Sequence, residues 1–271
     1  DQGIQTRYST EQDEQMKIAG TPFKQSFNTY GTVNSIRALV VSSNVYMFKS
    51  VIKLAGGNYV YNQPLGITNE MAQKTFKLMR NYYSMFGLGT KTGLDVPNEA
   101  QGFTGNTMNP GLLLDYSIGQ YDNYTPIQLV QYAATIANGG KKVQPKLVNT
   151  ATEVNTDYTV YENKTQVLSA LPGSKEDLET IQMGFREVVA GEHAIDPIKS
   201  LDVQVAAKTG TAEVEDFTNA SLVGYAPYDK EAKVAFACSV PESATNDQSV
   251  AGNLCAYNIM PEVLKEFFKK Y

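Results

Sequence analysis

The chain has 271 residues, of which 42% are hydrophobic, so it can bury a full core, and one large domain is favoured over two. Its 23 Lys and Arg residues against 28 Asp and Glu residues leave a net charge of −5. This mild acidity, without a Lys/Arg-rich block, argues against nucleic acid as a partner. Two cysteines and one histidine cannot complete a structural zinc site, so the sequence predicts neither a metal nor another cofactor.

The ends and the cysteines give three further expectations. No apolar run reaches about 18 residues and no signal peptide is visible, so the chain as given is expected to be soluble. The polar opening DQGIQTRYSTEQDEQ has no element in front of it, and we interpret it as a cut edge rather than a natural beginning. Cys238 lies in the alternating run KVAFACSV, which favours a buried free thiol over a disulfide with Cys255.

Two short helices are predicted from the periodicity of apolar residues. The first is expected to be capped by Thr32 and to end in the run Val41-Ser42-Ser43-Asn44, and the second to stop at Gly56 and Gly57. Ser42 and Asn44 then lie at a helix-to-helix corner, where short polar side chains can project together into a cleft. Ser and Asn are also ordinary helix N-cap residues, and this alternative stays open.

Three longer helices have clear start and stop signals, over residues 68–87, 125–139 and 174–191. In the second, Thr125 is the expected cap and Gln128 closes a capping box. The runs SLVGYAP and KVAFACSV are predicted to be antiparallel strands, and residues 251–271 a helix with a kink or a break at Pro261. Helices, then mixed strands, then a closing helix predict an α/β (α+β) fold in which helices cover both faces of an antiparallel sheet.

The segment LDVQVAAKTGTAE alternates as a half-buried strand does and ends in a K-T-G triplet. Strand alternation places Lys208 and Gly210 on one face, so that a cation stands beside bare backbone. Thr209 and Thr211 add hydroxyl and N–H groups, which can hold a carboxylate or a developing oxyanion. Alone, the triplet favours a strand that ends at a turn with its lysine in solvent, because three-residue matches are common.

The same triplet occurs at residues 91–93, in FGLGTKTGLDVPNEAQG. Glycines, Pro97 and Asn98 punctuate this segment and no alternating run leads into it, so we expect a loop. The context of the triplet, and not its letters, therefore selects Lys208 as the candidate.

Five ordered segments carry a family resemblance over the region from about Thr21 to Tyr271. They are VVSSNVYM, FGLGTKTGLDVPNE, SIGQYDNYTPIQLVQYAATIANGGKKVQPKLV, KTGTAE and NASLVGYAP. Together they resemble the penicillin-recognising serine enzymes, whose motifs are S-x-x-K, S-x-N and K-T-G. The resemblance is strongest to class B penicillin-binding proteins, the monofunctional D,D-transpeptidases of bacterial wall synthesis.

The resemblance implies acyl transfer on D-alanyl-D-alanine stem peptides of peptidoglycan, with β-lactams trapped as acyl-enzymes. By carry-over, Ser42 relays a proton towards the leaving amine and Asn44 holds the amide of the acyl chain. Lys208 and Thr209 hold the substrate carboxylate beside Gly210, and Thr211 supplies a hydroxyl and an oxyanion-hole N–H. The parent protein is expected at the extracytoplasmic face of the cell membrane, anchored there with other wall-synthesis proteins.

The nucleophile motif is the missing part. The family's S-x-x-K precedes its S-x-N, but the literal match Ser50-Val51-Ile52-Lys53 follows Ser42, with its middle residues on the apolar stripe of a helix. Ser50 and Lys53 are therefore expected to be ordinary helix-surface residues. Residues 1–271 are interpreted as part of a transpeptidase domain, inactive because the nucleophile, the anchor and a pedestal domain lie outside it.

Two other functions remain compatible with the sequence, a β-lactam sensor ectodomain and a catalytically dead scaffold homologue. The segment GEHAI departs from the family, which usually has glycine, threonine and a small residue there. This departure would fit a position of His193 near the mouth of the cleft, but a histidine in a surface loop is the favoured interpretation.

Overall fold

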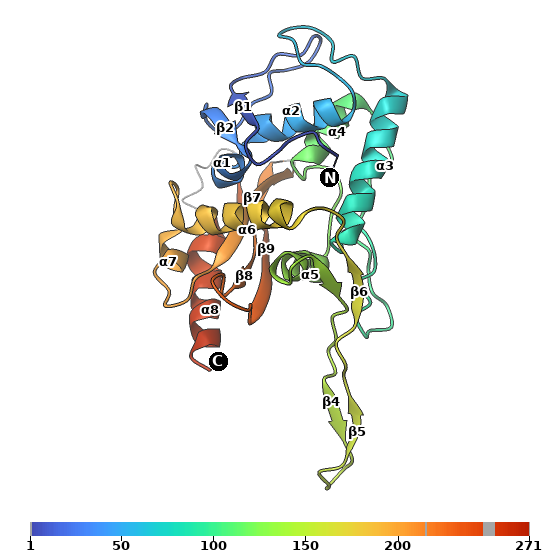
Figure 1. Cartoon of the computed structure of the whole chain (residues 1–271), viewed down its shortest axis with the longest axis vertical. Helices are drawn as coiled ribbons and strands as arrows, with labels where there is room; N and C mark the ends of the chain where they lie inside the picture. Colours follow the sequence, from blue (N-terminus) through green and yellow to red (C-terminus); the bar gives the residue numbers. More distant parts are fainter. Residues whose placement is uncertain (1, 215, 246–252, 271) are drawn as a thin grey trace.

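The computed structural model describes residues 2–214, 216–245 and 253–270. The first part of the chain is mainly helical, with one small antiparallel sheet in which β1 pairs with β2 (Figure 1). Its elements are β1 (Thr10–Asp13), β2 (Gly31–Asn34), α1 (Ser35–Val40), α2 (Asn44–Leu54), α3 (Asn69–Met85) and α4 (Pro110–Ser117). Apolar residues of α2, α3 and α4, among them Ile52, Phe76 and Leu113, form its buried core.

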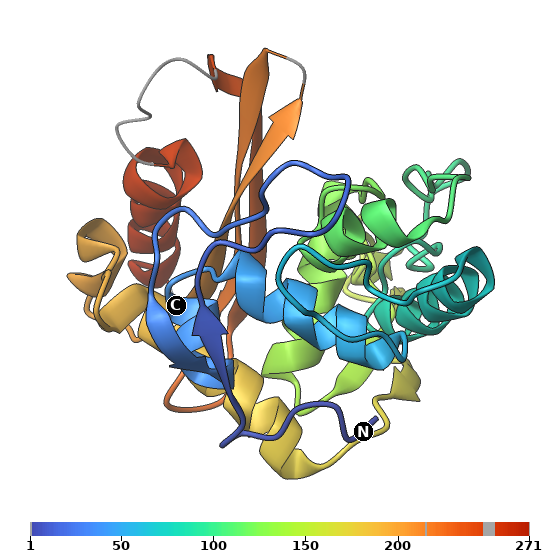
Figure 2. The ribbon, with the colours of Figure 1, turned by 90° about the horizontal axis from the view of Figure 1, so that it is seen from above.

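The second part is built on a three-stranded antiparallel sheet in the order β7-β8-β9. The strands are β7 (Ala206–Val214), β8 (Phe217–Ala226) and β9 (Val234–Thr245). The helical elements around it are α5 (Pro126–Ala137), α6 (Lys175–Ala190), α7 (Asp196–Lys199), the π-helical turn η1 (Cys255–Ile259) and α8 (Met260–Phe268). In Figure 2 this sheet lies between α8, in red, and the helices of the first half of the chain.

Alternation along the strands sends neighbouring side chains to opposite faces of this sheet. Ala206 of β7 and Tyr225 of β8 pack with residues of α5 and α6. Ala207 and Leu222 pack on the other side, with residues of α7, η1 and α8. The predicted antiparallel sheet with helices on both faces is therefore confirmed.

A long hairpin connects α5 to α6 and projects from the body of the molecule (Figure 1). Its base pairs β3 (Lys141–Val143) with β6 (Val167–Ala170), and its outer part pairs β4 (Thr150–Thr152) with β5 (Thr159–Glu162).

Most predicted helix boundaries are confirmed, because they depend on local capping bonds. Thr68, Thr125 and Ser174 are the N-caps of α3, α5 and α6, and the capping box of Thr125 with Gln128 is present. The predicted cap at Thr32 is wrong: residues 31–34 pair with β1 as a strand, and Asn34 caps α1 instead. Strand pairing with a distant segment therefore overrode the local signal.

The strand that carries the K-T-G triplet and the C-terminal helix both start later than predicted. Regular pairing of β7 begins at Ala206, and residues 201–205 precede the strand. Pro261 is the second residue of α8, where the π-helical turn η1 gives way to the α-helix. Residues 251, 252 and 271 of the predicted helix lie outside the described residues.

The expected free thiol is wrong, because Cys238 and Cys255 form a disulfide with a Cα–Cα distance of 5.7 Å. Cys238 is on β9 and Cys255 begins η1, which packs against the sheet on the side of α8. The bond therefore links the sheet to the start of the closing helical segment. Within the described ranges, no helix combines the length and the apolar character needed to cross a bilayer.

Candidate active site

In the turn between α1 and α2, the side chain of Ser42 is exposed and that of Ser43 is buried. The N–H of Ser42 donates to the carbonyl of Leu39 at 3.3 Å, and the N–H of Ser43 donates to that of Ala38 at 2.8 Å. Ser42 has a φ of 53°, in the left-handed region that non-glycine residues rarely occupy. As a result its side chain is exposed, whereas Ser43 is only 2% exposed.

The buried carboxylate of Asp13 anchors the corner between α1 and α2. Asp13 of β1 is 1% exposed, and its Oδ2 accepts hydrogen bonds from the hydroxyls of Ser43 and, at 2.7 Å, Ser26. The same hydroxyl oxygens accept from the first N–H groups of α2: Ser43 from Tyr46 at 3.0 Å, and Ser26 from Val45 at 3.2 Å. The N-terminus of α2 is thus tied to β1, with Ser43 as its cap.

Asn44, the first residue of α2, lies beside this anchored turn. Its Nδ2 donates to the carbonyl of Gln25 at 3.4 Å. The alternative that the corner residues serve as caps is thus true of Ser43, and not of Ser42 or Asn44.

Lys208 reaches this corner from the sheet. Its Nζ donates to Ser42 Oγ at 3.0 Å and to the carbonyl of Thr209 at 3.0 Å. Burial lowers the pKa of Lys208 to about 8, because the charged amine has lost much of its water. Gly210 lies opposite Ser221 of β8, and a Cβ at that glycine would be 2.4 Å from Ser221 Oγ, so a side chain there would force the Ser221 hydroxyl to turn away.

The corner and the strand line one cavity of about 280 Å³. All six residues predicted for the site contribute to its wall: Ser42, Asn44, Lys208, Thr209, Gly210 and Thr211. Ser117, Ile118 and Gln120 also line it, from the end of α4 and the turn after it. Among the described residues in this wall, Lys208 carries the only charged side chain. The cavity therefore presents one cation among hydroxyl and amide groups.

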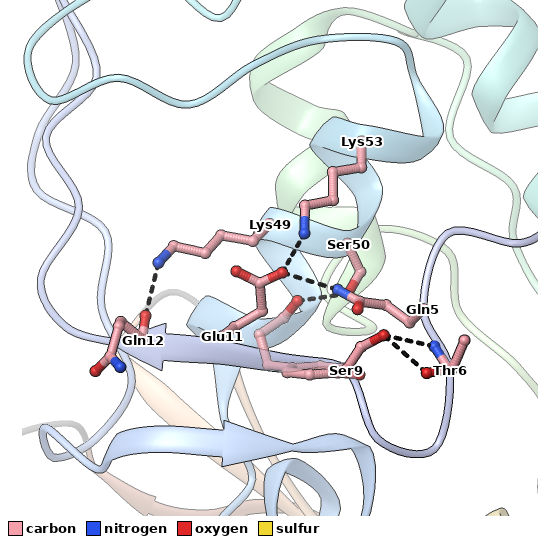
Figure 3. Close-up of polar contacts among 9 residues, drawn as sticks. Gln5, Thr6, Ser9, Glu11, Gln12, Lys49, Ser50 and Lys53 are labelled. Carbon is pink, nitrogen blue, oxygen red and sulfur yellow. Dashed lines mark hydrogen bonds and ion pairs between the residues drawn. The ribbon is translucent and has the colours of Figure 1, made fainter.

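The literal S-x-x-K match is not part of the cavity wall, and Figure 3 shows Lys53 directed at Glu11 and Ser50 beside Gln5. Ser50 Oγ donates to the carbonyl of Tyr46 at 2.7 Å and accepts from Gln5 Nε2 at 3.3 Å. Lys53 forms an ion pair with Glu11. Val51 and Ile52 are buried, as expected for an apolar stripe. The partners of Ser50 and Lys53 are therefore Gln5, Tyr46 and Glu11, and none of them belongs to the K-T-G strand.

The second K-T-G triplet is a loop, as predicted. Thr92 is buried, and its N–H and hydroxyl both donate to Glu99, whose other oxygen accepts from the N–H of Gly93. Although burial raises the pKa of Glu99, these hydrogen bonds outweigh it and lower the pKa overall. Here the triplet binds an internal carboxylate.

His193 is a surface residue, with its side chain 57% exposed and its Nε2 3.9 Å from Glu192. It is not part of the cavity wall. In the part of the chain that the structure describes, no group of three or more His, Cys, Asp or Glu residues could hold a metal ion.

The residues that hold the site in place were not predicted from the sequence. Asp13 and Ser26 lie in the polar N-terminal region and belong to no motif, so only the fold reveals their role. Asn253 was also missed: its Nδ2 donates to the carbonyls of Gly210 at 2.8 Å and Ser221 at 2.9 Å. Gln120 lies in the quoted segment SIGQY, which could have indicated it.

The chain is similar to known proteins in both sequence and structure. A family model described as the penicillin binding protein transpeptidase domain matches residues 1–261. Penicillin-binding protein 2A of Bacillus subtilis (strain 168) is 36% identical over 263 residues, which are 92% of this chain and 35% of that protein. Penicillin-binding protein H of the same organism is 38% identical over 253 residues, 87% of this chain and 35% of that protein.

The solved structure of penicillin-binding protein 2B from Streptococcus pneumoniae (strain R6) has a TM-score of 0.89 to this chain at 27% identity. The match covers 100% of this chain and 45% of that chain. The chain spans 35% of the length of each of the two curated relatives described above. It belongs to the family of class B penicillin-binding protein transpeptidase domains.

Proposed function

We propose that this chain forms part of a peptidoglycan D,D-transpeptidase, which cross-links D-alanyl-D-alanine stem peptides through a serine acyl-enzyme and is acylated by β-lactams. The observation that carries the proposal is the contact of Lys208 Nζ with Ser42 Oγ at 3.0 Å, in a cavity walled by both the S-x-N corner and the K-T-G strand. These two segments come from different halves of the fold, and chance proximity of two motifs would not require their reactive atoms to meet.

In this proposal Lys208 binds the terminal carboxylate of the stem peptide. With a pKa of about 8, roughly nine-tenths of the amine is protonated at pH 7. No carboxylate of the described wall neutralises it, so the cavity favours an anion. The hydroxyls of Thr209 and Thr211 add hydrogen-bond donors on the same strand.

The corner residues would handle the reacting amide. Ser42 Oγ, already bonded to Lys208, can pass a proton from the amine to the leaving D-alanine nitrogen. Asn44 can hold the amide of the acyl chain, and β7 is the edge strand of its sheet, so alternate N–H groups there can serve an oxyanion.

The chain by itself is proposed not to cross-link peptides. Ser50 donates its hydroxyl to the carbonyl of Tyr46 and Lys53 is paired with Glu11, so neither is available as an acylation pair. We place the nucleophile, a pedestal domain and a membrane anchor in parts of a longer parent protein, in line with the share of its relatives that the chain spans. The disulfide fits an extracytoplasmic location, where thiols are oxidised, beside other wall-synthesis proteins.

The test is to titrate the chain at pH 7 with an N-acetylated peptide that ends in D-Ala-D-Ala and to measure its binding from NMR chemical shifts. We expect Lys208→Ala to weaken binding by about 10- to 100-fold, since a hydrogen bond to a charged group contributes about 1.5–3 kcal/mol. Amidation of the peptide's C-terminus should produce a similar loss in the wild-type chain.

Lys91→Ala is the matched control, because it removes the lysine of the other K-T-G triplet, which does not line the cavity. It should leave binding unchanged. Equal affinities of the wild-type and Lys208→Ala chains would refute the proposed carboxylate site.

A further inference from the structure

The long hairpin between α5 and α6 takes no part in the candidate site. It projects from the body of the molecule (Figure 1), and none of its residues belongs to the cavity wall. Its outer part, residues 149–163, contains the paired strands β4 and β5, and we call this part the outer hairpin. A role for this segment therefore lies outside the chemistry of Ser42 and Lys208.

Large apolar side chains of the hairpin are exposed to solvent. Val154 is 81% exposed, Tyr158 67% and Val160 59%. Other exposed apolar residues of the same hairpin are Leu147, Val148, Tyr161, Val167 and Leu168. Because side chains alternate along a strand, Val160 and Tyr161 point to opposite faces, so each face of the ribbon carries an exposed apolar side chain. Apolar side chains gathered on a projecting segment are typical of a site of protein interaction.

The backbone of the outer hairpin also has edges that another strand can use. β4 and β5 form a two-stranded sheet, and within the described part of the chain no third strand pairs with either of them. Residues 149–163 contain neither proline nor lysine, two residues that often protect a free strand edge. An isolated two-stranded hairpin is only marginally stable in water, so an added strand would stabilise it.

The base of the hairpin is fixed to the body by the loop that contains the second K-T-G triplet. In this loop, the carboxylate of Asp95 accepts hydrogen bonds from the N–H groups of Leu147 at 2.7 Å and Val148 at 3.2 Å. Gln131 of α5, which is buried, donates from Nε2 to the carbonyl of Val143 at 2.8 Å. The outer hairpin is therefore held out from the body in a defined direction, which lowers the entropic cost of binding a partner.

The charge of the outer hairpin indicates the kind of partner. Glu153, Asp157 and Glu162 are exposed, and residues 149–163 include no basic residue. No ion pair of the described residues involves these three carboxylates. A second copy of the chain would bring like charges together, and a surface of anionic lipid would repel them as well. A strand with basic side chains is complementary.

We propose that the outer hairpin is the docking site for an extended segment of another protein, rich in basic and apolar residues. The segment adds a third strand to a free edge of the hairpin. Backbone pairing then supplies affinity, and the acidic side chains select a basic partner. This inference goes beyond the proposed function, because it assigns a partner surface outside the cavity.

The experiment uses a fluorescein-labelled peptide of about ten residues in which Lys alternates with Val or Thr, together with a matched peptide that has Glu in place of each Lys. Fluorescence anisotropy should show that the wild-type chain binds the lysine peptide and not the glutamate peptide. The added strand should also slow amide hydrogen exchange in residues 149–163, because newly paired N–H groups are protected.

The acidic side chains are tested by the triple variant Glu153→Gln, Asp157→Asn and Glu162→Gln. It should weaken binding of the lysine peptide by about 10-fold, since each exposed charge pair makes a modest contribution.

A chain with a shortened hairpin is the matched control. The N–H of Asn163 donates to the carbonyl of Asn149 at 2.7 Å, so an Asn-Gly turn can join these two residues in place of residues 150–162. The base of the hairpin is kept, and circular dichroism and urea unfolding check that the body is folded. This variant should not bind the lysine peptide.

Several outcomes would overturn the inference. They are failure of the lysine peptide to bind the wild-type chain, equal binding to the shortened chain, and unchanged amide exchange in the outer hairpin. A dimer in analytical ultracentrifugation, or binding to vesicles of anionic lipid, that is lost in the shortened chain would also overturn it, since the occupant would then be a second copy or a membrane.

These results are independent of the proposed carboxylate site. Lys208→Ala should bind the lysine peptide as the wild type does, and the shortened chain should keep the wild-type affinity for the D-Ala-D-Ala peptide. Failure of the lysine peptide to bind therefore overturns the docking site alone, and failure of the D-Ala-D-Ala peptide overturns the carboxylate site alone.

Discussion

At the scale of single residues, Lys208 is placed to act as a cation. Its amine lies in a cavity whose described wall holds no counter-charge, and burial lowers its pKa to about 8. Below this pH the protonated amine attracts carboxylates, and above it the neutral amine does not. The proposed binding of the peptide carboxylate therefore requires the protonated state of Lys208.

This requirement predicts a pH profile for binding between about pH 6 and 9.5. Binding of the D-Ala-D-Ala peptide should weaken as the pH rises through about 8, because the cation is lost while the peptide carboxylate stays ionised. NMR titration at a series of pH values would measure the affinity. An affinity that stays constant or increases over this range would contradict the proposed role of Lys208.

At the scale of elements, the position of α2 depends on a buried polar anchor. Ser43 caps the helix and shares the carboxylate of Asp13 with Ser26, so the first turn of α2 and strand β1 are held together. A buried carboxylate has a high desolvation cost, which hydrogen bonds must offset. The anchor thus sets where the corner with Ser42 and Asn44 faces the sheet.

Ser43→Ala tests this anchor. It removes an N-cap, worth about 1 kcal/mol, and takes one of two donors from a buried carboxylate, a loss of about 1–3 kcal/mol. We expect the free energy of unfolding to fall by about 2–4 kcal/mol in urea titrations. Ser174→Ala is the control, since Ser174 caps α6 at an exposed site and should cost only the cap. Equal losses in the two variants would show that Asp13 does not depend on Ser43.

Close packing of helices also determines the corner. Gly184 of α6 faces Leu39 of α1, where a Cβ would lie 2.4 Å from Leu39 Cδ1 and 3.1 Å from its Cβ. The glycine therefore allows α1 to approach α6, which in turn packs on β7. This contact brings the end of α1 to the strand that carries Lys208.

At the scale of the whole molecule, the candidate site exists only where two parts of the fold meet. The helical part supplies Ser42 and Asn44, and the sheet supplies Lys208 and its neighbours. Asn253, which follows the sheet in sequence, joins the carbonyls of Gly210 and Ser221 on adjacent strands. The site therefore depends on correct docking of segments from the beginning, middle and end of the chain.

The disulfide is one of the connections that hold this assembly, and its removal should lower stability. It joins Cys238 and Cys255, which are 17 residues apart, and closing a loop of that size contributes about 3 kcal/mol by the chain-entropy model. We expect the Cys238→Ser/Cys255→Ser double variant to lose stability of this order, measured by urea unfolding against the oxidised wild-type chain. Reduction of the wild type should have the same effect. Unchanged unfolding midpoints in both cases would contradict this prediction.

The sequence by itself determined the features that depend on near neighbours. The caps Thr68, Thr125 and Ser174 involve contacts within a few residues, and the structure has them. The five ordered segments identified the family because each is a continuous run of residues, which can be recognised from the sequence alone.

Only the tertiary structure decided the features that join distant segments. Strand pairing moved the cap of α1 to Asn34, and helix packing on the sheet joined Cys238 to Cys255. The same holds for the support from Asp13 and for the 3.0 Å contact between Lys208 and Ser42. Local patterns say which face a side chain takes, but which partner it meets depends on burial and packing of the whole chain, and these are not encoded in any one segment.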